Sequence, residues 1–177
     1  MKNFHELAKT RQSCRAYLTT PVPEEVLQRI IETVRLAPSA CNSQPWHFTV
    51  VTGERAKAVG LATRKGGANG FTENTPAFIV ISEGKATLSA RVAGILSSQH
   101  FAQIDIGIAT AHLCFAAQAE GLSTCILGWF DEKKLREAAA VSKDLTPRLV
   151  LAVGYAENED IREKKRKDTA KIATFLS

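Results

Sequence analysis

The sequence predicts one α+β domain over residues 1–177, and three observations support this fold class. A chain of 177 residues has the usual size of a single compact domain. Hydrophobic residues make up 45% of it and charged residues 23%, an ordinary globular composition that excludes the disordered and fibrous classes. Helical and β-rich segments follow one another without a strict βαβ alternation, which favours α+β over a parallel sheet.

The chain begins with two predicted helices. A short helix is expected over residues 3–10. A second helix is expected over 24–36, because Glu24 and Glu25 suit the positive end of a helix dipole and Pro38 stops the helix. Its apolar face is formed by residues at helical spacing, namely Val26, Ile30, Ile31 and Val34.

Two β-rich runs follow, and they are separated by a helical segment. Residues 47–51 and 78–81 are rich in β-branched and aromatic side chains, so they predict strands. Residues 54–64 are predicted to be helical. The glycine-rich segment 65–70 is predicted to be a flexible loop.

The longest predicted helix runs from about Ser97 to Glu120, and Gly121 follows where a glycine commonly ends a helix. Its large apolar residues do not keep to one face: they are Ile104, Ile106, Ile108, Leu113 and Phe115. A helix that is apolar nearly all round must be buried all round. We therefore expect this helix to be covered by its own domain and by a partner subunit.

The last part of the chain is predicted to complete the sheet and then leave it. Strands are expected at about 123–129 and 148–154, on either side of a helix over 131–140 that Asp131 leads. Residues 157–177 are charged and lack an apolar period, so they are expected to form an arm outside the core.

The charge balance and the cysteines limit the functional classes. The net charge of +5 and the pI near 9.1 indicate either a polyanion such as nucleic acid or a small anionic ligand. The cysteines are widely spaced and form no CxxC pair, which argues against a zinc site and a disulfide framework: they are Cys14, Cys41, Cys114 and Cys125. No secretory signal or membrane-spanning run is recognisable, so a reducing cytoplasmic location is expected.

Three stretches carry candidate binding residues. Arg11-Gln12-Ser13-Cys14-Arg15 combines guanidinium groups with a hydroxyl, which suits a phosphate, although a solvated basic helix end would look similar. Residues 37–46 are rich in amides and hydroxyls that can read a planar heterocycle, although turns use the same residues. Residues 162–167 are basic and suit nucleic acid or a phosphate, but they lack the aromatic residues that stack on bases.

Taken together and in order, these stretches resemble the FMN-dependent nitroreductase family. The resemblance covers essentially the whole chain, through the Arg-x-Ser-x-Arg opening, "APSACNSQPWHFTVV", "FAQIDIGIATAHLCFAAQAEGLSTC", "ILGWFDEKKL", "LVLAVGYA" and "KKRK". It implies a mixed or antiparallel sheet flanked by helices, in an intertwined homodimer with the long helix at the interface. Two FMN sites would lie between the subunits.

The resemblance also implies a set of cofactor-binding residues. Arg15 would lie near the N1 and O2 atoms of the flavin ring, and Asn42 of the other subunit would bond the ring edge. The backbone at Leu127 and Gly128 would pass the flavin atom N5. Lys164 and Arg166 would close on the FMN phosphate. The full set is Arg11, Gln12, Ser13, Arg15, Pro38, Ser39, Asn42, Gln44, Leu127, Gly128, Lys164 and Arg166.

The implied activity is a ping-pong hydride transfer from NADH or NADPH, through flavin N5, to nitroaromatics, quinones or similar acceptors. No catalytic side chain and no metal are expected, because FMN carries the chemistry. The chain is short for this family, and residues 64–73 are a candidate for a reduced lid over the site. Alternatives are an FMN-storage or sensing protein, and a same-fold enone reductase, dehalogenase or flavin reductase. Nucleic-acid and membrane partners are not expected.

Overall fold

The computed structural model describes residues 3–158 and 160–176. Its helices and strands follow this order: α1 (Phe4–Thr10), α2 (Glu24–Val34), β1 (Trp46–Thr52), α3 (Gly53–Thr63), β2 (Ala77–Glu83), α4 (Leu88–Ser97), α5 (Phe101–Ala119), β3 (Ser123–Leu127), α6 (Glu132–Ala138) and β4 (Thr146–Gly154). Short 3₁₀ turns lie at Ala40–Asn42, Lys65–Gly67, Gly70–Asn74 and Thr169–Lys171.

The strands form one antiparallel sheet in the order β1-β2-β4-β3. β2 and β4 are therefore central, and Ile79 of β2 pairs with Leu151 of β4. The sheet and its flanking helices confirm the predicted α+β class. Glu159 and Ser177, which belong to the predicted arm, lie outside the described residues.

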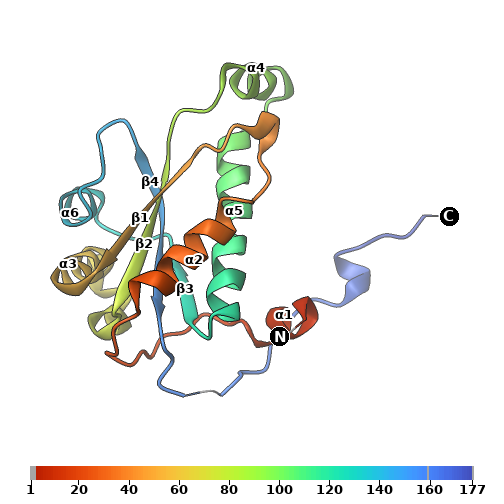
Figure 1. Cartoon of the computed structure of the whole chain (residues 1–177). Helices are drawn as coiled ribbons and strands as arrows, with labels where there is room; N and C mark the ends of the chain where they lie inside the picture. Colours follow the sequence, from red (N-terminus) through yellow and green to blue (C-terminus); the bar gives the residue numbers. More distant parts are fainter. Residues whose placement is uncertain (1–2, 159, 177) are drawn as a thin grey trace.

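Each face of the sheet packs against a pair of helices (Figure 1). Side chains alternate between the faces of a strand, so Ile79 and Ile81 join the core beneath α2 and α5. Phe78 and Val80 join the second core, beneath α3 and α6. Both faces of β2 are thus buried, which explains why its sequence is apolar almost throughout.

The predicted helix over 97–120 begins too early, and the helix α4 before it was not predicted. The chain reverses direction at Ser98, whose φ of 54° is left-handed, before α5 begins at Phe101. At Gly94 the returning backbone comes so close that a β-carbon would lie 2.9 Å from the Gln99 oxygen. The segment predicted as a flexible loop, 65–70, instead contains short 3₁₀ turns.

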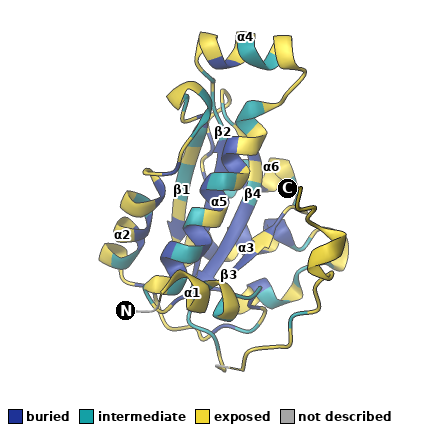
Figure 2. Ribbon diagram, turned by 90° about the vertical axis from the view of Figure 1, so that its right-hand side faces the viewer, coloured by how far each residue is buried: buried dark blue, intermediate teal, exposed yellow. Residues whose placement is uncertain are grey.

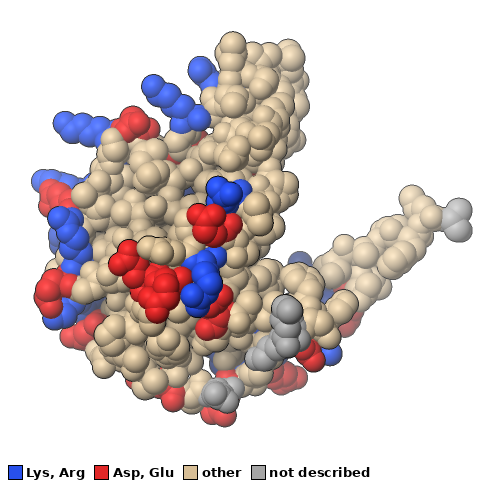
Figure 3. Space-filling model, viewed as in Figure 1, with Lys and Arg blue, Asp and Glu red and all other residues tan. Residues whose placement is uncertain are grey.

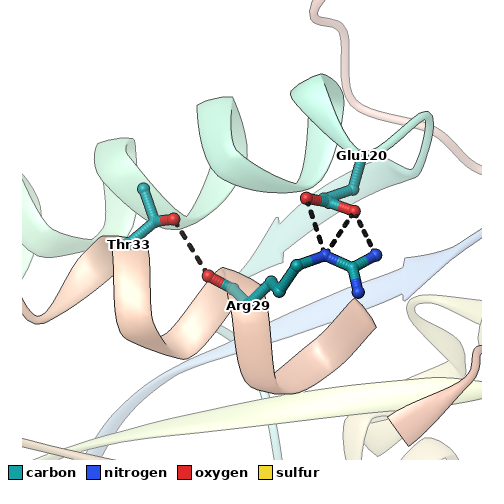
Figure 4. A network of polar contacts seen from close by, with 3 residues as sticks. All are labelled: Arg29, Thr33 and Glu120. Atoms are coloured by element: carbon teal, nitrogen blue, oxygen red, sulfur yellow. Dashed lines mark hydrogen bonds and ion pairs between the residues drawn. The ribbon is translucent and has the colours of Figure 1, made fainter. Parts of the chain in front are cut away.

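The C-terminal end of α5 is fastened to α2 by an exposed ion pair (Figure 4). Arg29 Nη2 donates to Glu120 Oε2 at 2.7 Å, and Arg29 Nε reaches both carboxylate oxygens at 3.2 Å. The guanidinium holds the pKa of the Glu120 carboxyl below its usual range. This pair links α2 to the end of α5, and neither of its residues belongs to the predicted binding stretches.

The outer side of α5 is apolar and only partly covered within the chain. Its residues recur at helical spacing: Ile104, Gly107, Ile108, Ala111 and Phe115. We call them the α5 stripe. Phe4 of α1 packs on Phe115 with ring centroids 4.9 Å apart, while Ile104 stays 47% exposed. The single chain therefore buries the inner side of this helix and leaves much of the stripe open (Figure 2).

The surface beside the stripe is also apolar. Leu88, Ile95 and Leu96 of α4 are exposed, and the edge of the molecule along α4 and α5 carries almost no charged side chains in Figure 3. The arm runs away from the body in Figure 1 and exposes Phe175 and Leu176. No described helix is both long and apolar enough to span a membrane.

Candidate functional site

The first predicted stretch lies alongside the edge strand β3. Ser13 forms a parallel bridge with Thr124, and the Cys14 amide donates to the Thr124 oxygen at 2.9 Å. Cys14 and Tyr17 consequently turn into the core, while Arg15 points out and is exposed. This pairing gives an irregular segment a fixed position, because its backbone groups need partners.

The thiols beneath this stretch are structural. Burial raises the pKa of Cys125 and of Cys114, and it raises the pKa of Tyr17 far above its ordinary value. A buried thiol with a raised pKa is a poor nucleophile. We therefore assign these groups to packing and not to chemistry.

Residues of the arm (157–177) form hydrogen bonds with the first predicted stretch (11–15). Gln12 Nε2 donates to the Asp160 oxygen at 2.6 Å, and the Arg162 amide donates to Gln12 Oε1 at 3.1 Å. Arg162 Nη2 also donates to the Ser13 oxygen at 2.6 Å. Arg162 belongs to the basic run 162–167 but is not among the predicted site residues, because sequence spacing does not reveal a contact across 150 positions.

Three cations meet where the arm crosses the end of α1. Lys164 Nζ donates to the backbone oxygens of Ala8, at 3.1 Å, and Lys9. Burial lowers the pKa of Lys164, and the nearby charges of Arg11 and Arg166 lower it further. No Asp or Glu in the described ranges forms an ion pair with any of the three. Such an uncompensated cluster suits a phosphate, whose charge would relieve the repulsion.

The predicted site residues Leu127 and Gly128 lie at the end of β3, where the chain offers its backbone only. The Leu127 side chain is buried in the core beneath α3 and α6, so a ligand there would meet its main chain. Gly128 is exposed, and a β-carbon on it would meet nothing nearer than Leu149 Cδ2 at 3.8 Å. The backbone at Gly128 is therefore open enough for a planar group to approach it.

The candidate lid segment packs beside this open backbone. The exposed Trp129 donates its indole N–H to the Lys65 oxygen at 3.0 Å, and Lys65 Nζ lies 5.5 Å from the centre of the indole ring. Asn69 adds a hydrogen bond of 3.4 Å to the Trp129 oxygen. Residues 65–69 therefore border the backbone at Leu127 and Gly128.

The second predicted stretch lies at the opposite end of α5. The Ala40 amide donates to both carboxylate oxygens of Asp105, at 3.1 and 3.2 Å. The turn that follows is tied together by the Gln44 amide, which donates to Ser39 Oγ at 3.0 Å, and by Gln44 Nε2, which donates to Asn42 Oδ1 at 3.1 Å. The exposed Pro38 precedes it. Asn42 and Gln44 are exposed, so their amides are available to a ligand.

The backbone of this turn is strained. Cys41, Asn42 and Gln44 have φ values of 50°, 49° and 45°. Left-handed residues other than glycine cost about 1 kcal/mol or more each, and they persist only where the surroundings hold them. The turn is therefore a constrained structure, and Asp105 is one of the groups that hold it.

The structure places most of the predicted site residues in two groups. Arg11, Gln12, Ser13, Arg15, Lys164 and Arg166 gather near the C-terminal end of α5, whereas Pro38, Ser39, Asn42 and Gln44 lie at its N-terminal end. Leu127 and Gly128 belong to neither group and lie at the end of β3, beside residues 65–69. Asp105 lies at the N-terminal end of α5 and Gln118 at its C-terminal end. Gln118 lines a cavity of about 910 Å³ together with Gln12, Ser13 and Arg15. Asp105 and Gln118 are 13 positions apart in the sequence, which corresponds to about 20 Å along the helix.

Comparisons with known proteins agree with the fold. A model of the nitroreductase family matches residues 8–155. YodC of Bacillus subtilis strain 168, whose assignment as an NAD(P)H nitroreductase is provisional, is 26% identical over 99% of this chain and 100% of its own length.

Solved structures share the same architecture. A nitroreductase family protein from Clostridium novyi NT has a TM-score of 0.77 and 25% identity, covering 92% of this chain and 89% of its own. A protein from Exiguobacterium sibiricum 255-15, solved in complex with FMN, has a TM-score of 0.81 and 24% identity, covering 99% and 98%.

Proposed function

The chain belongs to the nitroreductase family, and from this membership we propose that it is an FMN-dependent oxidoreductase acting as a homodimer. Its electrons would come from NADH or NADPH, the donors in the names of its relatives. Its acceptors would be nitroaromatics, quinones or similar small molecules. Two FMN sites would lie between the subunits.

The observation that carries this proposal is the division of the candidate residues between the ends of α5. The amides stand at the end of α5 that Asp105 marks, and the cations gather at the end that Gln118 marks, about 20 Å further along the helix. A second chain would bring the two kinds of group onto one flavin. Ala111 lies midway between Asp105 and Gln118 on the α5 stripe. A twofold axis near Ala111 would set two α5 helices antiparallel and bring the amide turn of one chain to the cation cluster of the other.

The residues present fit FMN. Arg11, Lys164 and Arg166 supply positive charge that no described carboxylate neutralises, as a phosphate requires. The amides of Asn42 and Gln44 offer paired donors and acceptors to the edge of a flavin ring. The backbone at Leu127 and Gly128 leaves space for the ring itself.

When bound, FMN supplies the redox chemistry, taking a hydride from NADH or NADPH at N5 and passing the electrons to an acceptor. Arg15 would supply a fixed positive charge where reduction leaves negative charge on the ring, and so would favour hydride uptake. Gly128, with no side chain, would leave the approach to the ring open. Donor and acceptor would use the same space in turn, which would give ping-pong kinetics.

The test of function is anaerobic reduction followed by an acceptor screen. The purified protein is expected to take up FMN, turn yellow, and lose this colour within seconds when NADH or NADPH is added. A yellow protein that does not bleach would be a flavin carrier, and a protein that takes up no FMN would contradict the proposal. Nitroaromatic, quinone, enone, halogenated aromatic and free-flavin acceptors then identify the substrate class.

The shared site is tested with mixed dimers. One subunit carries Lys164→Ala with Arg166→Ala, and the other carries Asn42→Ala. Suppose that each site combines the cations of one chain with the amides of the other. One site of the mixed dimer then has native cations and native amides, whereas the second site lacks both the cations and the Asn42 amide. FMN titration should then find one site of native affinity per dimer. Two weakened sites, one without the cations and one without the amide, would show that each chain forms its own site.

The basic arm is assigned to this site and not to nucleic acid. Its cation Arg162 is hydrogen-bonded to Gln12 and Ser13, and Lys164 is bonded to α1, so neither forms part of a continuous exposed basic face. Binding to a DNA duplex is expected to be negligible at physiological salt. A steeply salt-dependent DNA complex would contradict this assignment.

A further inference from the structure

Asp105 is a buried carboxylate without a cationic partner. Its side chain is 3% exposed, and none of the ion pairs among the described residues includes it. Both of its oxygens accept from one backbone group, the Ala40 N–H. In a buried site the Ala40 N–H and the Asp105 oxygens have no water to replace each other, so breaking this contact would leave polar groups without partners. Asp105 therefore constrains the backbone at Ala40.

Ala40 is the first residue of the strained turn. The three left-handed residues, Cys41, Asn42 and Gln44, follow directly, and the turn closes through Ser39 Oγ. A second tie holds its far side, because the Thr87 amide donates to Ser43 Oγ at 2.9 Å. The turn is thus held between α5 and the start of α4. Releasing Asp105 would let the left-handed residues relax toward ordinary conformations.

We propose that Asp105 is a positioning residue, which fixes the Ala40 amide and thereby sets the Asn42 and Gln44 amides for the flavin of the partner subunit. This inference rests on the proposed function. Asp105 does not touch the flavin in this arrangement. It acts through the turn, as residues behind a binding site commonly do when they hold the groups that contact the ligand.

The first test compares Asp105→Ala with Asp105→Asn. The alanine variant removes both acceptors, whereas the asparagine variant keeps one oxygen for the Ala40 N–H. We expect about tenfold weaker FMN binding for the alanine variant, as for a lost charge-assisted hydrogen bond, and a smaller loss for the asparagine variant. The matched control is Thr110→Ala, because Thr110 is 2% exposed on the same helix and bonds only within it, at 2.7 Å to the Ile106 oxygen.

A second readout needs no flavin. Amide hydrogen exchange over residues 39–44 should be faster in Asp105→Ala than in the native protein, and unchanged in Thr110→Ala. A general loss of stability would instead raise exchange throughout α5 and the sheet. Native exchange over 39–44 in Asp105→Ala would overturn the proposal.

A double-mutant cycle separates positioning from packing. If Asp105 acts through Asn42, the Asn42→Ala change should alter FMN affinity and the potential of bound FMN much less in the Asp105→Ala background than in the native protein. Additive effects would overturn the inference. Native protein that binds no FMN would overturn the proposed function together with the inference. Native protein that binds FMN while Asp105→Ala binds it equally well would overturn the inference alone.

Discussion

The two ends of α5 present opposite kinds of binding surface. At the N-terminal end, uncharged amides stand on a strained turn that a buried carboxylate and a serine hydroxyl hold. At the C-terminal end, three cations gather where the arm crosses α1, and an extended segment pairs with β3. In the proposed function, the amides at one end would bind the neutral ring of FMN and the cations at the other end would bind its phosphate. The two ends would then be complementary halves of one site.

The largest loss of FMN binding is expected from a change that keeps the two subunits apart. Ala111→Glu puts a charge at the middle of the α5 stripe, where the second chain would pack, and burying an unpaired charge is costly. The subunit should still fold because Ala111 is exposed within it. We expect loss of the dimer and of FMN binding in light scattering and flavin titration.

The matched control for this change is Ala58→Glu. Ala58 is an exposed alanine on α3, on the other side of the sheet. This variant should stay dimeric and yellow. An Ala111→Glu protein that remained dimeric would show that α5 does not form the interface.

The next largest effect is expected from removing the positive charge near the C-terminal end of α5. Lys164→Ala with Arg166→Ala should weaken FMN binding by about 100-fold, because two charge-assisted contacts to a phosphate are lost. Binding of riboflavin, which has no phosphate, should change little. Titration of both ligands measures the difference.

Lys133→Ala with Lys134→Ala makes the same change in net charge on α6, where both lysines are exposed. It should leave the preference for FMN over riboflavin unchanged. Equal losses for FMN and riboflavin in the arm variant would mean that these cations support the fold and do not hold the phosphate.

A smaller effect is expected at the N-terminal end. Asn42→Ala removes one amide from the ring edge, which should weaken FMN and riboflavin by a similar factor of about ten. Because the phosphate is not involved, the ratio of the two affinities should stay native. A change confined to FMN would reverse the assignment of the two ends.

The smallest effect is expected from changing the ion pair between Arg29 and Glu120, which lies outside the candidate site. Arg29 lowers the pKa of Glu120, so the pair stabilises the folded chain above the ordinary carboxyl pKa and loses this contribution as the pH falls through the lowered value. Glu120→Gln should lower Tm at neutral pH by no more than about 2 °C. The difference should vanish in acid, and FMN affinity should stay native in both conditions.

Much of the fold could be predicted because its signals are local. Asp131 accepts from the Lys134 amide at 3.1 Å and caps α6 as its sequence position indicates, and Gly121 takes a φ of 78° after α5. Helix α4 was missed because its apolar residues Leu88, Ile95 and Leu96 are exposed. The apolar residues of α4 therefore do not form a face that packs on the core of the same chain, and such a face is the usual signal of a helix.

The candidate site was less accessible to sequence reasoning. The residue types of the three stretches indicated phosphate and heterocycle binding, and the resemblance supplied their roles. The bond from Ala40 to Asp105 and the contact of Arg162 with Gln12 join positions far apart in the chain. No spacing rule connects such positions, and the left-handed turn uses no glycine that would have indicated it.

The distance along α5 also has a consequence for how the protein keeps its cofactor. In the proposed dimer, each flavin site would exist only while two chains are together, so flavin retention would follow mass action in protein as well as in flavin. Dilution should then release FMN from the protein before any subunit unfolds. Bound FMN would in turn link the two chains, so flavin-rich conditions should favour dimers at concentrations where the free chains separate.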